Sequence, residues 1–224
     1  IIGSGVSTFF VVNGPLRQAQ RDLADAHGII SGYNAVEEYQ DINSVLVTAR
    51  DLFDAKDVTL YGIKTFSNMS IDRAILDATS VLCDTKSILS DIFLNIISER
   101  KDYLDPVDTV LYEDGMGISA WIKDRRVLIG SRELMINHNI DVPSKDYEER
   151  YIAKDRSLIY LSAAGELSAV FVVGLTFNEE KRNIMVDIYN QDMVIVGKSV
   201  DPILTNSQLS SIFDMPKYAF RVIP

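Results

Sequence analysis

The sequence has little of what several classes of protein require. Its 224 residues include one cysteine, Cys83, and two histidines, His27 and His138. A single cysteine excludes a disulfide framework and a cysteine-rich metal site, and it fits a reducing, cytosolic setting. A zinc site or a histidine-based catalytic triad would have to be assembled from very few parts. We therefore predict no metal site and no catalytic residue of these kinds.

Positive charge is also scarce. The chain carries 22 Lys and Arg against 32 Asp and Glu, which gives a formal net charge of −10. Binding of nucleic acid depends on clustered basic side chains that displace counterions, and no basic stripe occurs here. We expect no nucleic-acid partner. With 47% hydrophobic and 24% charged residues, the composition is that of a folded globular protein.

The first 13 residues carry no charge at all. They are too few to cross a bilayer, which takes roughly 20 apolar residues, and they lack the basic start of a signal peptide. Two interpretations stay open: a buried strand or helix, or the cytoplasmic end of a membrane helix. Arg17 and Arg21 weakly favour the second, because positive charge gathers on the cytoplasmic flank.

The spacing of apolar residues predicts the order of helices and strands. Val45, Leu46 and Val47 in a row predict a strand buried on both faces, as in a parallel sheet. Tight hairpin turns are expected at Lys123-Asp124 and Ala164-Gly165. The other expected elements are a helix over 15–27, a strand over 57–66, helices over 70–84 and 87–100, strands over 107–113, 117–123 and 125–131, helices over 132–139 and 144–156, a hairpin over 157–174, a helix over 178–191, a strand over 193–197, a helix ending near 213 and a strand over 218–224.

Strands and helices alternate at both ends of the chain, and the region between them is mostly antiparallel in pattern. This order predicts an α/β fold in which one domain is discontinuous and carries an inserted domain. The discontinuous α/β domain is expected over residues 1–65 and 175–224. The inserted α+β domain, an antiparallel sheet with flanking helices, is expected over residues 66–174.

Two stretches resemble a known family. Residues 15–47, PLRQAQRDLADAHGIISGYNAVEEYQDINSVLV, resemble the segment of P-type ATPases that leads from a membrane helix into the phosphorylation domain. Residues 112–140, YEDGMGISAWIKDRRVLIGSRELMINHNI, are similar to the nucleotide-domain core of the heavy-metal-transporting branch. There a Gly-x-Gly turn precedes a strand pair and a Val-Leu-(Val or Ile)-Gly-(Asn or Ser) corner.

The resemblance covers nearly the whole chain. It implies a HAD-like discontinuous domain with a nucleotide-binding-like insertion, placed at the cytoplasmic face of the cell membrane. It also implies transmembrane helices in the same parent chain as partners, and ATP or ADP as the ligand. Whether Mg²⁺ accompanies the nucleotide is left open.

Nucleotide-binding positions are implied by the resemblance at Gly115, Gly117, Gly130 and Ser131. Glycine lets a backbone approach a ligand closely. The residues themselves allow another interpretation, in which the Gly-x-Gly starts a tight hairpin, Gly130 ends a strand and Ser131 caps the next helix.

The chain departs from the family where phosphorylation takes place. P-type ATPases follow the buried strand with Asp-Lys-Thr-Gly-Thr, and that aspartate accepts the γ-phosphoryl group of ATP. In the same register this chain has Thr48, Ala49, Arg50, Asp51 and Leu52. A threonine hydroxyl without a positioned base is a weak nucleophile, and its ester is not the labile acyl phosphate of the family. Arg50 and Asp51 are interpreted as a solvated turn.

Other motifs of the family are incomplete. Residues 67–75, SNMSIDRAI, hold neither the His nor the Pro of the Ser-x-His-Pro motif. In residues 194–205, VIVGKSVDPILT, Asp201 keeps the carboxylate of the Thr-Gly-Asp loop, whereas its neighbours differ. A Gly-Asp-Gly-x-Asn-Asp motif does not occur in residues 1–224. Asp201 alone makes a thin magnesium site, because Mg²⁺ relies on several oxygen ligands.

These departures predict a non-catalytic cytoplasmic region of a P-type-ATPase-like membrane protein. Its expected role is regulatory or sensing, with residual nucleotide binding. Two other functions stay open: part of an active ATP-driven cation transporter, and a nucleotide-binding module without hydrolysis.

Overall fold

The computed structural model describes residues 16–25, 28–32, 34–35, 38, 41–113, 115–152, 156–176, 178–199, 201 and 203–223. The chain forms two units, Ile1–Asn43 and Ser44–Pro224. In the first unit residues 16–25 are helical, as the sequence predicts, and Gln18 Nε2 donates to Asp22 Oδ1 at 2.9 Å. The uncharged stretch 1–13 lies outside the described residues. Within the described ranges, no helix is both long and apolar enough to cross a membrane.

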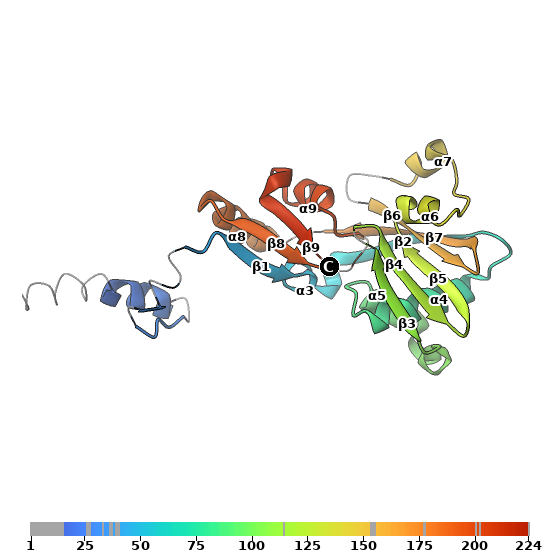
Figure 1. The fold of residues 1–224 in the computed structure, drawn as a ribbon, viewed down its shortest axis with the longest axis horizontal. Helices are drawn as coiled ribbons and strands as arrows, with labels where there is room; N and C mark the ends of the chain where they lie inside the picture. Colours follow the sequence, from blue (N-terminus) through green and yellow to red (C-terminus); the bar gives the residue numbers. More distant parts are fainter. Residues whose placement is uncertain are drawn as a thin grey trace, which may run out of the picture. The chain divides into compact units, whose positions relative to one another are not determined.

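A small parallel sheet joins the two ends of the second unit (Figure 1). Its strands lie in the order β1 (Ser44–Thr48), β8 (Val194–Lys198) and β9 (Phe220–Ile223). The parallel strand that Val45 to Val47 predict is confirmed, but its burial on both faces is wrong. Successive side chains of a strand point to opposite faces, and Leu46 is 63% exposed on one face of β1, whereas Val47 is 8% exposed on the other.

Short helices connect and cover this sheet. They are α3 (Ala49–Leu52), α8 (Glu179–Asn190), α9 (Asn206–Phe213) and the 3-10 helix η3 (Lys217–Ala219). α8 contacts β8, and α9 contacts β9. The ring of Phe213, at the end of α9, lies 5.9 Å from Phe53 and 5.7 Å from Phe220 between centroids. Three aromatic rings from distant segments therefore hold α9 on the sheet.

The larger sheet has six strands, and every neighbouring pair is antiparallel. Its strands are β2 (Val58–Thr65), β3 (Thr109–Glu113), β4 (Gly117–Ile122), β5 (Arg125–Gly130), β6 (Arg156–Ala163) and β7 (Glu166–Leu175), in the order β2-β7-β6-β5-β4-β3. The predicted hairpin turns are confirmed at Lys123-Asp124 and Ala164-Gly165. Both residues of each turn have positive φ, as in the type I′ turns that match the twist of a hairpin.

Strand β2 belongs to this larger sheet. The predicted boundary at residue 65 places it in the discontinuous domain, yet its backbone pairs with β7 from Val58↔Leu175 to Thr65↔Ala169. The 3-10 helix η1 (Ala55–Asp57) precedes it, and Thr176 N donates to Asp57 O at 2.8 Å. The chain thus enters and leaves the larger sheet at neighbouring points.

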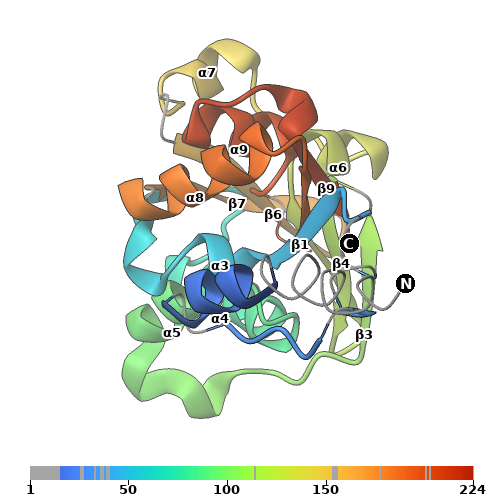
Figure 2. The same cartoon turned by 90° about the vertical axis from the view of Figure 1, so that its left-hand side faces the viewer.

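Helices cover both faces of the larger sheet (Figure 2). On one face lie α4 (Ile71–Asp84) and α5 (Ser90–Ile97), followed by the 3-10 helix η2 (Ser98–Tyr103); on the other lie α6 (Arg132–Asn137) and α7 (Lys145–Glu149). Side chains alternate along β7, since Phe171 packs edge-on against Phe93 of α5 at 5.0 Å, whereas Val170 packs in the cluster that contains Leu134 of α6. The predicted class, an α/β fold with an antiparallel sheet and flanking helices, is confirmed. The helix expected over 144–156 is shorter than predicted.

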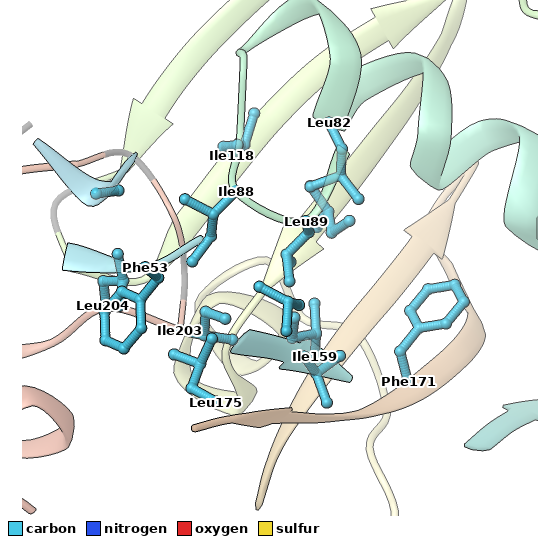
Figure 3. Close-up of a cluster of buried hydrophobic side chains, with 14 of the residues drawn as sticks. Phe53, Leu82, Ile88, Leu89, Ile118, Ile159, Phe171, Leu175, Ile203 and Leu204 are labelled. Atoms are coloured by element: carbon cyan, nitrogen blue, oxygen red, sulfur yellow. The ribbon is translucent and has the colours of Figure 1, made fainter. Parts of the chain in front are cut away.

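One apolar core extends from the small sheet into the larger one (Figure 3). It contains residues that follow β1 and β8 together with residues of α4, of the segment between α4 and α5, and of β4, β6 and β7. Those labelled in Figure 3 are Phe53, Leu82, Ile88, Leu89, Ile118, Ile159, Phe171, Leu175, Ile203 and Leu204. Because this core is continuous, we expect the two sheets to unfold together.

Truncating a side chain beside the small sheet tests this coupling. Phe53 is 2% exposed, and Phe53→Ala is expected to lower the free energy of unfolding by about 3–5 kcal/mol. Trp121, the one tryptophan of the chain, lies in β4 of the larger sheet. Its fluorescence midpoint in urea should fall together with the circular-dichroism midpoint. Leu46→Ala, at an exposed position, is the control. A Trp121 transition unmoved by Phe53→Ala would contradict a shared core.

Candidate functional site

The carboxyl end of β1 is where the sequence analysis looks for chemistry. Thr48 ends the strand, and both its N–H and its hydroxyl donate to Asp51 Oδ2 at 2.7 Å. These hydrogen bonds, the side-chain one first, lower the pKa of Asp51. Thr48 thus has a carboxylate partner that the sequence analysis did not foresee. A carboxylate with a lowered pKa is nevertheless a poor base for an alcohol.

Arg50, two residues further on, reaches across to the larger sheet's helices. Its guanidinium pairs with Asp91 Oδ2 at 3.0 Å and donates to Ser87 O at 3.3 Å and Ser90 Oγ at 3.2 Å. Arg50 is exposed, as the interpretation of a solvated turn expects, but its guanidinium also makes these contacts with another segment, which that interpretation does not include. The guanidinium ties the tip of β1 to the segment between α4 and α5.

Asp201, which follows β8, also contacts the segment between α4 and α5. It is 7% exposed, and it accepts from Ser87 Oγ, from Ile88 N at 3.2 Å and from Ser199 Oγ at 3.1 Å. Burial raises the pKa of this carboxyl, against the opposing effect of these hydrogen bonds. The carboxylate predicted for a Thr-Gly-Asp-like loop is thus buried and hydrogen-bonded to other groups of the protein.

The segment Thr85–Leu89, here called the α4–α5 loop, consequently lies on the tips of both β1 and β8. Ser87 makes the polar contacts, and Ile88 and Leu89 enter the continuous core beside Ile203 and Leu204 (Figure 3). Nothing in the sequence marks Ser87 as a partner of Asp201, which is 114 residues away. This loop is the main feature of the site that sequence reasoning missed.

Gly117 and Gly130 lie at one end of the β4–β5 pair, where β4 begins and β5 ends. Gly117 pairs with Gly130, and a Cβ on Gly117 would lie 2.4 Å from Ile129 O and 2.6 Å from Gly130 Cα. A Cβ on Gly130 would lie 2.3 Å from Met116 O. Both positions therefore require glycine because the backbone itself approaches so closely. Ser131 caps α6, since its Oγ accepts from Leu134 N at 3.3 Å.

Gly115 differs from the other two glycines. It has a φ of +65°, and a Cβ built on it would meet no atom within 4 Å. It lines a pocket of about 530 Å³ together with Gly117 and Asp201, here called the glycine pocket. Thr205, Asn206, Ser207 and Arg221 also line it. Ser131 and Gly115 line a neighbouring pocket of about 470 Å³.

The structure thus brings Gly115, Gly117 and Asp201 together, whereas Thr48 and Gly130 are not among the described residues that line the glycine pocket. Arg221 is the one cation among those lining residues, and no motif in the sequence pointed to it. Glu113 lines the pocket as well and pairs with His138 Nε2 at 2.6 Å. No cluster of three His, Cys, Asp or Glu suited to a metal ion occurs in the described part of the chain.

No family model matches the chain, and no curated protein matches it in sequence. It is similar in structure to heavy-metal-transporting P-type ATPases. A zinc-transporting PIB-type ATPase in the E2.Pi state is 11% identical over 87% of this chain, with a TM-score of 0.43. The catalytic domain of the CPx-ATPase CopB-B, from a study of nucleotide binding, is 14% identical over 87% of this chain, with a TM-score of 0.48.

The N-domain of HMA6, a copper-transporting P-type ATPase, is 17% identical over 52% of this chain, with a TM-score of 0.42. The chain spans 31% of the length of the zinc-transporting ATPase, 66% of the CopB-B chain and 98% of the HMA6 N-domain. With identities below 25% and TM-scores below 0.5, these likenesses do not say which residues of this chain act.

Replacing Asp201 tests its structural use. Because its pKa is raised on folding, its contribution to stability is present at low pH and is lost as pH rises through the folded-state pKa. Asp201→Asn keeps an oxygen for Ser87 and Ile88 and can donate to Ser199. We expect this variant to gain stability over the wild type as pH rises towards 8, in urea titrations across that range.

Asp201→Ala is the matched control. It leaves the Ser87 hydroxyl and the Ile88 N–H without their acceptor, which should cost about 1–3 kcal/mol. If Asp201→Asn were as unstable as Asp201→Ala at pH 8, a charged carboxylate would be required and the structural interpretation would be wrong.

Proposed function

We propose that this chain is the cytoplasmic region of a P-type-ATPase-like membrane protein and that it accepts no phosphoryl group. In this proposal the small parallel sheet is the core of a HAD-like domain, and the parent chain supplies the transmembrane helices. The role of the region is regulatory or sensing. The observation that supports the proposal is the tip of β1, which ends in Thr48, a hydroxyl side chain and not a carboxylate.

The neighbouring carboxylates support the absence of phosphoryl transfer. Asp51 accepts two hydrogen bonds from Thr48, Asp54 Oδ1 lies 3.3 Å from Lys181 Nζ, and Asp201 is buried against Ser87. An attacking carboxylate must lie in line with the γ-phosphoryl group, close to it and free of competing partners. Each of these three carboxylates is already hydrogen-bonded or ion-paired with a neighbouring side chain.

The alternative is an active ATP-driven cation transporter with unusual residues. It would require Asp51 or another nearby carboxylate to take the role of the missing aspartate. Metal-stimulated release of phosphate from the intact parent protein is the result that would favour this alternative.

Phosphorylation can be tested directly. After incubation of the intact parent protein with ATP labelled in the γ-phosphoryl group, we expect no acid-stable, hydroxylamine-sensitive label, because an acyl phosphate needs a carboxylate acceptor. Thr48→Asp should remain unlabelled too, since the new carboxylate would face Asp51 and the α4–α5 loop would still hold Asp201. Hydroxylamine-sensitive label in the wild type would overturn the proposal; label in Thr48→Asp alone would mean that only the nucleophile has been lost.

Nucleotide binding without hydrolysis is part of the same proposal. The glycine pocket has space for a nucleoside, an open backbone at Gly115 and one cation, Arg221. Asp201, in contrast, has its carboxylate oxygens bonded to protein groups, so the pocket offers Mg²⁺ little. A nucleoside diphosphate therefore suits the pocket better than Mg·ATP.

Calorimetry with ADP checks this binding. We expect weak binding that does not depend on Mg²⁺ and that falls about tenfold in Arg221→Glu, because reversing an exposed charge removes its attraction for the phosphates and adds repulsion. Lys217→Glu makes the same charge change at an exposed position outside the pocket. Equal affinities in the two variants would place ADP elsewhere, and no heat in the wild type would remove nucleotide from the proposal.

A further inference from the structure

Another pocket lies on the face of the larger sheet that carries α6 and α7, next to the pocket of about 470 Å³, with which it shares Glu148, Arg156, Leu158 and Tyr160. Its volume is about 220 Å³, and β2, β6, β7 and α7 line it. Leu158, Val170 and Val172 give it an apolar lining. None of the residues singled out from the sequence as site residues is among its described lining residues. We call it the tyrosine pocket, after Tyr61, Tyr147, Tyr151 and Tyr160, which line it.

The tyrosines give the pocket several aromatic surfaces. The rings of Tyr147 and Tyr151, one turn apart at α7, lie 5.3 Å apart between centroids and are tilted by 53°. On the β2 side, Arg156 lies over the ring of Tyr61, with Cζ 4.0 Å from the centroid. Aromatic surfaces at such angles favour contact with a further ring, edge-on or offset.

The charge around the pocket is positive. Lys64, Arg150 and Arg156 line it, whereas Glu148, the one carboxylate among the described lining residues, is paired with Arg132. In a chain with a net charge of −10, such a local excess of positive charge favours an anionic ligand.

Tyr160 carries the sharpest observation. Its side chain is 2% exposed, and its hydroxyl is the one buried side-chain polar atom of the described residues that has no hydrogen-bond partner. Buried polar groups nearly always have a hydrogen-bond partner, so an unpaired hydroxyl on a residue that lines a pocket indicates a ligand that can pair with it. Burial raises the pKa of Tyr160 to about 12, which keeps the hydroxyl protonated and able to donate at neutral pH.

We propose that the tyrosine pocket binds a small planar aromatic carboxylate, whose ring packs among the tyrosines and whose oxygens meet the basic side chains and the Tyr160 hydroxyl. The volume lies below the roughly 300–1,000 Å³ of sites for drug-sized ligands, so the ligand has one or two rings. The tyrosine pocket and the glycine pocket share none of their described lining residues, so this proposal does not depend on the function proposed for the glycine pocket or for the tip of β1.

Calorimetry with 2-naphthoate and its neutral analogue 2-naphthamide tests the ligand class. The wild type should bind the carboxylate at least about tenfold more tightly than the amide, because a hydrogen bond to a charged group contributes that factor or more. Absence of heat with millimolar 2-naphthoate, or equal affinity for the two compounds, would overturn the proposal.

Two variants locate the site. Tyr160→Phe removes only the orphan hydroxyl, so its thermal midpoint should stay level or rise while its affinity for 2-naphthoate falls about tenfold. Arg150→Gln should weaken binding of the carboxylate and leave binding of the amide unchanged. Tyr103→Phe, at an exposed position, is the control for Tyr160→Phe. Wild-type affinity in both Tyr160→Phe and Arg150→Gln would mean that 2-naphthoate binds elsewhere.

Discussion

The buried carboxyl of Asp201 is the constraint on which the arrangement of the site depends. A carboxyl this far from water needs hydrogen-bond partners, and Ser87 and Ile88 of the α4–α5 loop supply them together with Ser199. With Ser87 held by Asp201, the next two residues, Ile88 and Leu89, lie in the same apolar core as Ile203 and Leu204. Arg50 then closes the contact from the β1 side. The polar contact and the apolar core thus stabilise the same junction between the two sheets.

Glycine is required for two physical reasons in this chain, close approach of the backbone and a positive φ, and Gly117, with a φ of +145°, combines both. At Gly117 and Gly130 the reason is internal, because the facing backbones leave no space for a Cβ. At Gly115 the reason is conformational, since its φ is positive and the space beside it is open. Of the three, only Gly115 keeps its backbone accessible to a ligand. A Gly-x-Gly pattern followed by Val-Leu-Ile-Gly therefore indicates a tightly paired hairpin first and a nucleotide contact second.

Local patterns predicted local structure well. Alternating apolar residues predicted the hairpins, and the two-residue turns predicted at their ends have positive φ in the structure. Ser131, predicted as a helix cap, caps α6. What depends on distant pairing was out of reach: Ser87 with Asp201, Arg50 with Asp91, and β2 with β7. An apolar run such as Val45 to Val47 also cannot tell an edge strand from a central one, because its neighbours are more than 140 residues away in the chain. The orphan hydroxyl of Tyr160 is likewise visible only once its surroundings are folded.

The junction that the α4–α5 loop makes with Asp201, Arg50 and the core is costly to open. Thr48 at the tip of β1 is itself exposed, whereas withdrawal of the α4–α5 loop would expose Ile88 and Leu89, which are 3% and 0% exposed. Exposing two buried aliphatic side chains costs about 3–6 kcal/mol in total, at roughly 1.5–3 kcal/mol each. The loop would also lose its contacts with Asp201 and Arg50. A transport cycle that opened this junction would have to meet that cost at every turnover.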